Sequence, residues 1–252
     1  MSVFDAHAHI IDPRFPLIEN HGYLPDPFTI ADYRAETAGY EITGGAIVSG
    51  SFQGTDQTYL IAALAELGPD WAGVTVLDPD ATDDDIIELD RLGVRAIRFN
   101  LKRGYVDIAT LTHQVLRANE LVGWHAEFYV DGSLLSSLEP VLSKIPKLSI
   151  DHLGMSEDVL PYLLDLVDRG AHVKATGFGR VNLDVVESMR RIHAVNPSAL
   201  IFGSDLPGTR AERPFEPGDL DLIRDAVGED YQRVLETNAR EFYRVPARIA
   251  QD

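Results

Sequence analysis

Short apolar segments alternate with amphipathic segments eight times along this chain of 252 residues, with no linker between them. The apolar segments contain many β-branched residues, which is typical of strands. The predicted strands are Val3–His9, Gly44–Gly50, Ala72–Leu77, Val94–Leu101, Trp124–Val130, Leu148–Leu153, His172–Gly177 and Leu200–Asp205. Eight such repeats predict one (β/α)8 barrel, a TIM barrel, formed as a single domain by residues 1–252.

The segments between the predicted strands carry helix signals. Thr82, for example, precedes a run with three acids in its first turn, and Gly93 follows its last turn. An open, doubly wound sheet is the alternative architecture. It would normally have fewer strands and a GxGxxG turn after the first strand, and this chain has no such turn there.

The composition limits the partners and the chemistry. With 22 basic and 40 acidic residues the formal charge is −18, which argues against nucleic acid or an anionic membrane as a partner. The chain has no cysteine, which excludes disulfides and cysteine-ligated zinc. We see no signal peptide and no apolar stretch long enough to span a membrane, so we expect a cytoplasmic protein. Assembly into a homo-oligomer is left open.

Four polar residues lie where predicted strands end. Alternation places Asp5, His7 and His9 on one face of the first strand. The sixth strand ends near His152 and the eighth ends at Asp205. In a barrel, the carboxyl ends of the strands surround one mouth, where the reactive groups are found. We therefore expect the three imidazoles and the Asp205 carboxylate to meet there.

This set of side chains suits two kinds of chemistry. Three imidazoles and a carboxylate are the ligands of a divalent metal site, for which Zn²⁺ or Mn²⁺ is the candidate ion. The same groups can act without metal, the imidazoles holding a carbonyl oxygen while Asp205 takes a proton from water. The residues do not choose between one divalent ion and none.

Cations gather around the predicted mouth. Arg98 lies on the fourth strand, and Arg103 lies in the loop that follows. Arg180 follows the seventh strand, and Arg210 and Arg213 follow the eighth. In so acidic a protein, these arginines indicate a site for a carboxylate, which a guanidinium binds with two parallel hydrogen bonds.

The fifth and seventh strands carry further polar residues that face inward. Glu127 and Lys174 would be buried there and must be paired, so we predict an ion pair in the middle of the barrel. His125 and Tyr129 share the face of Glu127. His125 lies deep and is expected to be structural, whereas Tyr129 lies at the strand end near the mouth.

Several motifs together resemble a known family. They are DAHAH at residues 5–9, DHLG at 151–154, GSDLP at 203–207 and NAREFY at 238–243. In order and over the whole chain, they resemble the amidohydrolase superfamily of TIM-barrel hydrolases. RFNLKRGYVD at 98–107, WHAEFY at 124–129 and KATGFGR at 174–180 are most similar to the 2-pyrone-4,6-dicarboxylate lactonase group.

The resemblance implies a role for each matching residue. His7, His9 and His152 would engage a lactone carbonyl, and Asp205 would activate water. The residues that would hold or line the carboxylated substrate are Arg98, Arg103, Arg180, Tyr129, Ser49 and Ser51. Lactonases of this group are thought to act without metal, whereas decarboxylase and amidase relatives use zinc or manganese.

We therefore expect a hydrolase of a small carboxylated lactone or related cyclic ester. The alternatives are a metal-dependent decarboxylase or amidase of the same superfamily, and a catalytically silent barrel that only binds carboxylates. Loss of activity on treatment with a chelator would indicate the metal-dependent enzyme. Tolerance of substitutions at His7 or Asp205 would indicate the barrel that only binds carboxylates.

Overall fold

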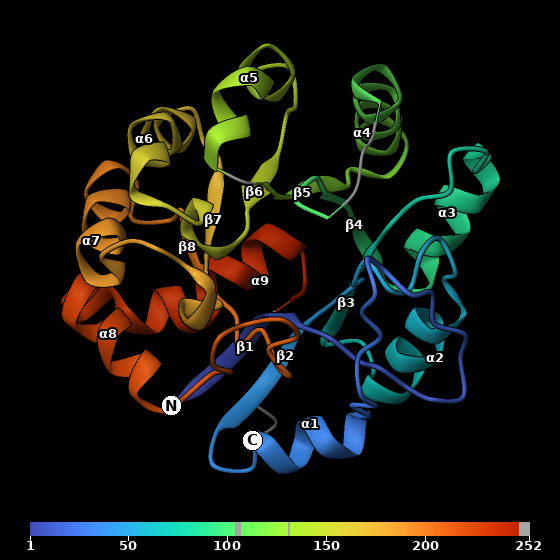
Figure 1. Cartoon of the computed structure of the whole chain (residues 1–252), viewed down its shortest axis with the longest axis horizontal. Helices are drawn as coiled ribbons and strands as arrows, with labels where there is room; N and C mark the ends of the chain where they lie inside the picture. Colours follow the sequence, from blue (N-terminus) through green and yellow to red (C-terminus); the bar gives the residue numbers. More distant parts are fainter. Residues whose placement is uncertain (104–106, 131, 247–252) are drawn as a thin grey trace.

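The computed structural model describes residues 1–103, 107–130 and 132–246, and its eight strands form one parallel sheet in sequential order (Figure 1). The strands are β1 (Ser2–Ala8), β2 (Glu41–Val48), β3 (Trp71–Thr75), β4 (Val94–Asn100), β5 (His125–Tyr129), β6 (Leu148–Ile150), β7 (His172–Ala175) and β8 (Leu200–Phe202). Backbone hydrogen bonds close the seam beyond β8. The Asp205 amide donates to the His7 carbonyl at 2.7 Å, and the His9 amide donates to the Leu206 carbonyl at 2.8 Å. The predicted TIM barrel is confirmed, and the open sheet is excluded.

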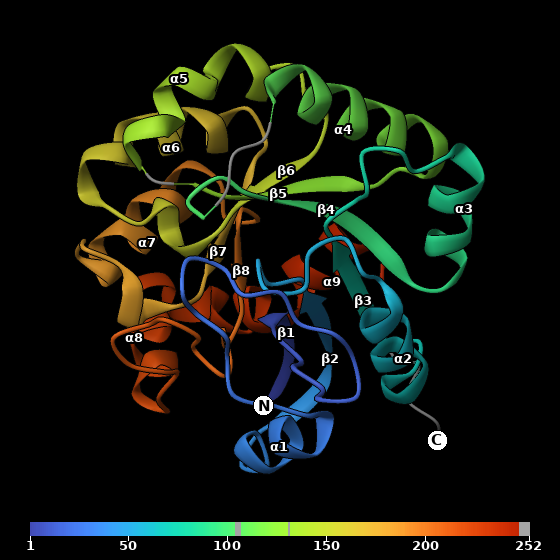
Figure 2. The same cartoon turned by 45° about the vertical axis from the view of Figure 1, so that its right-hand side comes forward.

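Helices surround the sheet and follow each strand in turn (Figure 2). They are α1 (Ile30–Glu36), α2 (Thr58–Leu67), α3 (Asp83–Arg91), α4 (Ile108–Val122), α5 (Gly132–Leu142), α6 (Leu160–Asp168), α7 (Val185–Val195) and α8 (Gly218–Val227). Thr82 caps α3 as predicted. Its side chain accepts a hydrogen bond from the Asp85 amide, and the Asp85 carboxylate accepts one from the Thr82 amide. None of the helices in the described part of the chain is long and apolar enough to cross a membrane.

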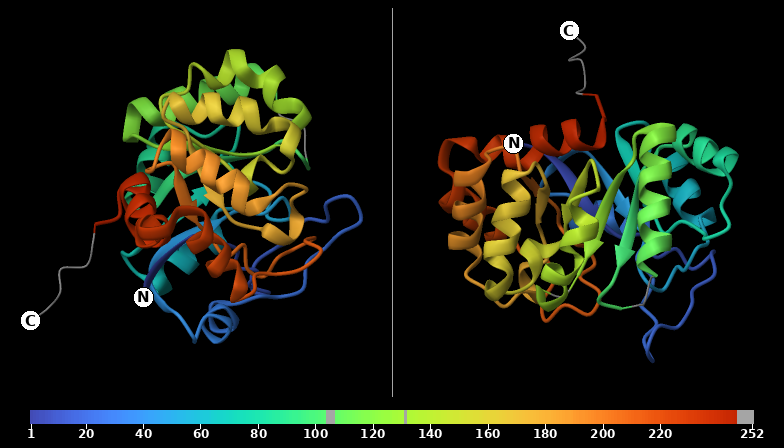
Figure 3. Two further views of the ribbon diagram at one scale, coloured as in Figure 1. Left: turned by 90° about the vertical axis from the view of Figure 1, so that its left-hand side faces the viewer. Right: turned by 90° about the horizontal axis from the view of Figure 1, so that it is seen from above.

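One end of the barrel is closed by the last helix, α9 (Asn238–Tyr243). Figure 3 (right) shows it across the end where β1 begins, with the long segment after β1 projecting from the opposite end. Phe242 and Tyr243 are buried against Phe4 and Ala6 inside the barrel. Because this end is packed with side chains, the open end at the strand carboxyl termini is the one left for a site.

Six of the eight strands are shorter than the sequence predicts, and β6 and β8 are shortened the most. The sixth and eighth predicted strands extend to Leu153 and Asp205, but β6 ends at Ile150 and β8 ends at Phe202. His152 and Asp205 lie beyond the sheet with φ values of 53° and 60°, in the left-handed region that few residues other than glycine adopt. Such local strain is frequent at functional sites.

The prediction that Asp5 shares a face with His7 and His9 is wrong. The pairing of β1 with β2 shifts register between Asp5 and Ala8, so one residue is inserted into the alternation. Asp5 points out of the barrel, where it accepts a hydrogen bond from the Tyr33 hydroxyl of α1 at 2.8 Å. The irregularity leaves His7 and His9 both facing inward.

Candidate active site

The structure brings His7, His9, His152 and Asp205 together at the open end of the barrel. The ring centroid of His7 lies 5.1 Å from that of His9 and 5.1 Å from that of His152. Oδ1 of Asp205 lies 3.7 Å from Nε2 of His7 and 3.6 Å from Nε2 of His9. All four residues are buried. The seam hydrogen bonds between β1 and the segment after β8 set this geometry, because they join the backbones of the histidine and aspartate segments directly.

Arg180 holds Asp205 as a carboxylate. Oδ2 of Asp205 accepts from Nε of Arg180 at 2.8 Å and also from Nη2 of the same guanidinium. Burial by itself raises the pKa of this carboxyl, but the charge of Arg180, together with the interactions with His152, His9 and His7, outweighs burial and holds the pKa of Asp205 well below its usual range. Oδ1 has no hydrogen-bond partner among the described residues. One oxygen is thus fixed, and the other can accept a proton from water.

The neighbours of each ring nitrogen assign the tautomers of two histidines. Nδ1 of His9 lies 2.7 Å from the Val48 carbonyl, which can only accept, so Nδ1 carries the proton and Nε2 the lone pair. Nδ1 of His7 lies 3.2 Å from Nζ of Lys174 and 3.5 Å from Oδ1 of Asp151. The closer group, an ammonium, can only donate, which places the lone pair of His7 on Nδ1 and its proton on Nε2.

A buried charge network supports this arrangement from below. Nζ of Lys174 donates to Oε2 of Glu127 at 2.5 Å, which confirms the predicted ion pair. Asp151 joins it, with Oδ1 3.7 Å from Lys174 and Oδ2 accepting from Arg98 at 3.2 Å. The sequence interpretation missed Asp151. Asp151 lies two residues after Ser149, which faces into the barrel from β6, so strand alternation could have predicted that Asp151 faces inward as well.

Two glycines allow the histidines to approach the backbone closely. A Cβ on Gly203 would lie 2.5 Å from Cβ of His7. A Cβ on Gly177, which has φ +61°, would lie 2.5 Å from Nδ1 of His152. Any side chain at either position would displace a histidine, and the sequence interpretation assigned neither glycine a role.

Four arginines surround the mouth above this cluster. The mouth pocket is lined by His9, Tyr23, Gly50, Ser51, Phe52, Arg98, Asn100, Arg103, Tyr129, His152, Arg180, Asp205, Thr209 and Arg210. The Arg210 guanidinium stacks on Tyr23, 4.3 Å from the ring centroid. Burial and then repulsion by the charge of Arg103 lower the pKa of Arg210. An anion between them would relieve that repulsion.

Other predicted substrate-binding residues are placed differently. Arg213 does not line the mouth pocket, because its guanidinium pairs with Asp219, Nη2 lying 2.7 Å from Oδ1. Ser49 does not line the mouth pocket, and its hydroxyl lies 2.6 Å from that of Tyr59 in α2. Its carbonyl accepts from Nη1 of Arg98 at 2.6 Å. Ser49 therefore orients Arg98, whereas Ser51 faces the pocket.

The side chains of the cluster can supply the ligand atoms for a divalent ion if His7 is in one particular tautomer. The ligand atoms of His7, His9 and Asp205 lie within 4.8 Å of one another. Nε2 of His7 and Oδ1 of Asp205 lack hydrogen-bond partners among the described residues, and Nε2 of His9 presents a lone pair. His7 would complete the set with its proton moved to Nδ1 and donated to Asp151. The residues therefore fit a metal, on condition of that proton shift.

The buried histidines make the stability of the fold depend on pH. Burial, followed by the charge of Lys174, lowers the pKa of His7 to about 3, and burial lowers the pKa of His125 and of His172 to about 4. In the unfolded chain these groups titrate near 6.5. Below that pH the unfolded state binds more protons, so stability is full above about 6.5 and is lost as the pH falls.

Between about pH 6.5 and pH 5, we expect the free energy of unfolding to fall with a slope that grows to about 1.4 kcal/mol per pH unit for each of these histidines. Urea unfolding across this range measures the slope. A His172→Gln variant should show a shallower slope by roughly one histidine's share. A free energy that does not change over the range would contradict the assignment of neutral, buried imidazoles.

Comparison with known proteins gives a family and related enzymes. The sequence profile of the amidohydrolase family, Amidohydro_2, matches residues 4–245. A curated relative from Comamonas testosteroni, 2-pyrone-4,6-dicarboxylate hydrolase, is 24% identical over 231 residues, which are 81% of this chain and 76% of the relative. The D-galactarolactone isomerase of Agrobacterium fabrum is 26% identical over 246 residues, which are 89% of this chain and 83% of the relative.

Solved structures share the barrel. One from Acinetobacter baumannii, described as a probable 2-pyrone-4,6-dicarboxylic acid hydrolase with citric acid bound, matches with a TM-score of 0.82 at 22% identity, covering 96% of this chain and 99% of that one. One from Agrobacterium tumefaciens, without ligand, matches with a TM-score of 0.85 at 24% identity, covering 97% and 96%. At these identities the likeness establishes the fold.

Proposed function

Because the chain belongs to the amidohydrolase family over nearly its whole length, we propose that it is a hydrolase of a small carboxylated lactone. The observation that carries the proposal is the position of Oδ1 of Asp205. This oxygen is without a hydrogen-bond partner among the described residues, faces two histidines, and lies in a pocket lined by four arginines. The names of the two curated relatives support a lactone as the substrate, since one is a lactone hydrolase and the other a lactone isomerase.

The attacking water would lie between two acceptors. Oδ1 of Asp205 and Nε2 of His9 both present lone pairs and are 3.6 Å apart, so a water nearby can donate one proton to each. As the water oxygen bonds to the lactone carbonyl carbon, Asp205 takes the proton that the water loses. The ion pair with Arg180 keeps the carboxylate ionised for this step at neutral pH.

The carbonyl oxygen would lie on the donor side of the cluster. Nε2 of His7 carries its proton in the tautomer that Lys174 sets, and it can donate to the oxygen as negative charge develops. Burial also lowers the pKa of His152, so this imidazole is neutral and has one N–H to offer. Collapse of the intermediate breaks the ring C–O bond, and the proton on Asp205 passes to the departing ring oxygen.

A divalent ion held by His7, His9 and Asp205 would supply Lewis-acid polarisation of the same carbonyl. The arginines would serve either form of the reaction. Arg98 is anchored by Ser49 and Asp151, whereas Arg103 and Arg210 lie at the rim of the mouth pocket. A carboxylate bound at the rim would orient the lactone over the cluster, which lowers the entropic part of the barrier.

Replacement of Arg180 by methionine tests this site. We expect KM for the carboxylated lactone to rise about 30-fold or more, because the mouth pocket loses one of its four arginines and the Asp205 carboxylate, no longer paired, repels the substrate carboxylate. The acidic limb of kcat/KM should also move to higher pH, because Asp205 loses the cation that lowers its pKa. Initial rates of ring opening over a range of pH measure both effects.

Arg213→Met is the matched control, since Arg213 pairs with Asp219 outside the mouth pocket. Its KM should stay within about threefold of the wild type. Equal changes in the two variants, or none in Arg180→Met, would argue against a substrate-binding mouth centred on Arg180.

A further inference from the structure

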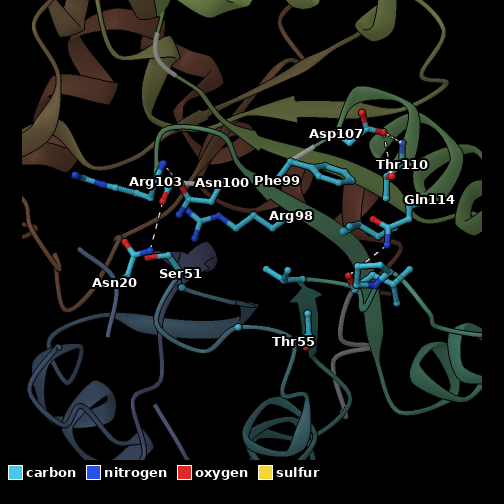
Figure 4. Close-up of a pocket in the computed structure, with 16 residues that line it drawn as sticks. Asn20, Ser51, Thr55, Arg98, Phe99, Asn100, Arg103, Asp107, Thr110 and Gln114 are labelled. Carbon is cyan, nitrogen blue, oxygen red and sulfur yellow. Dashed lines mark hydrogen bonds between the residues drawn. The ribbon is translucent and has the colours of Figure 1, made fainter. Parts of the chain in front are cut away.

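A second pocket opens beside the mouth pocket, between the ends of β3 and β4 and the start of α4 (Figure 4). We call it the side pocket, and its volume is about 500 Å³. The residues that line both pockets are Gly50, Ser51, Arg98, Asn100 and Arg103. The two pockets therefore adjoin, and Arg98 and Arg103 lie at the boundary between them.

The wall of the side pocket away from the arginines is apolar. Leu77 follows β3, and Ile97 and Phe99 belong to β4. Phe99 is held in place by stacking on Phe128, with ring centroids 5.4 Å apart and planes at 22°. Val76 completes this surface. Such a wall binds hydrocarbon through the hydrophobic effect. It offers a polar ligand no hydrogen bonds to replace those that the ligand loses with its water.

Several polar side chains of the side pocket are already engaged by the protein. The Asp107 carboxylate caps α4 by accepting from the Thr110 amide at 2.9 Å. Gln114 donates to the carbonyls of Leu77 and Asp78, at 3.4 and 3.2 Å. These bonds satisfy groups that would otherwise bind a polar substituent.

We propose that the side pocket binds an apolar substituent of the substrate, so that the substrate class is a carboxylated lactone bearing an alkyl or aryl group. The carboxylate would lie against the guanidinium groups of Arg98 and Arg103, and the substituent would extend past them toward Phe99. The inference rests on the proposed function for the lactone ring. The arginines at the boundary would bind the carboxylate, and the apolar wall of the side pocket beyond them would bind the hydrocarbon.

A series of alkylated diacids tests the side pocket without relying on turnover. The probes are glutarate and glutarates that carry methyl, propyl or pentyl at carbon 2, with affinity measured by calorimetry. We expect affinity to rise about fourfold for each methylene that enters the pocket. An affinity that does not depend on chain length would overturn the proposal.

Two variants on α4 locate the effect. Thr110→Trp would fill the pocket from its partly exposed edge, and the gain with chain length should disappear. His113→Trp, on the exposed side of the same helix, should keep the wild-type gain. A gain that persists in Thr110→Trp would place the substituent elsewhere and overturn the proposal.

Failure of the reaction and failure of the side pocket give different results. Loss of lactone hydrolysis with the chain-length dependence intact would remove the proposed reaction and support the pocket. Hydrolysis of an unsubstituted carboxylated lactone with no chain-length dependence would support the reaction and remove the pocket.

Discussion

Replacement of Asp205 by asparagine is expected to lower kcat for lactone hydrolysis by about 10³-fold or more, with the fold retained. The amide has no lone pair basic enough to take a proton from water, so the base is lost while the shape is kept. Asparagine also tolerates the left-handed backbone at this position, where φ is 60°. The substitution therefore isolates the chemistry of the carboxylate.

Initial rates and circular dichroism on the same preparation measure the two parts of this prediction. Asp225→Asn is the control, since Asp225 is an exposed residue of α8 and its replacement should leave kcat unchanged. If the Asp205→Asn protein keeps about a tenth or more of the wild-type kcat, another group activates the water.

Replacement of Lys174 by methionine is expected to lower the free energy of unfolding by about 3–5 kcal/mol. Lys174 is fully buried and neutralises Glu127, which also accepts hydrogen bonds from Tyr243 and His125. Without the ammonium, a buried carboxylate is left with no cation beside it, and that costs more than a lost surface contact.

A second substitution separates charge from packing. The double variant Lys174→Met with Glu127→Gln removes both charges and should recover about half of the loss, because no unpaired ion remains at that position. Lys144→Met, at an exposed lysine, should change the free energy of unfolding by less than about 0.5 kcal/mol. Urea unfolding measures all three, and a Lys174→Met variant as stable as Lys144→Met would contradict the buried ion pair.

The fold could be predicted from the sequence because each barrel unit carries its own local signals. Thr82 and the acids after it predict the start of α3, and the apolar runs predict the strands. The ends of β6 and β8 could not be found in this way. The predicted strands continue to Leu153 and Asp205, whereas the left-handed backbone at His152 and Asp205, which is not extended, depends on contacts in the folded chain that a single sequence does not show.

The site was predictable where topology alone brings residues together. His7, His9, His152 and Asp205 lie at or just beyond the carboxyl ends of strands, and an eight-stranded barrel brings these ends to one mouth. Asp5 was placed on the wrong face because the register shift in β1 depends on its pairing with β2, which a single sequence does not show.

Side-chain partners were harder to predict than positions. Arg213 lies after the last strand, as Arg210 does, but Asp219 lies close enough to pair with it and removes it from the mouth pocket. Asp151, next to His152, was not predicted as a site residue, although its carboxylate links Arg98 to His7. The need for glycine at position 203 arises only from the close approach of His7, which is a property of the folded chain.

The most direct test of the central claim is ring opening of 2-pyrone-4,6-dicarboxylate in ¹⁸O-labelled water by chelator-treated protein, assayed with and without added Zn²⁺ or Mn²⁺, with unsubstituted 2-pyrone as the comparison. We expect one labelled oxygen in the opened acid, and a kcat/KM at least about 10³-fold higher for the dicarboxylate, because its carboxylates can bind the arginines of the mouth pocket. Similar rates for the two lactones, or no incorporation of label, would contradict a carboxylate-directed hydrolase built on Asp205 and the three histidines.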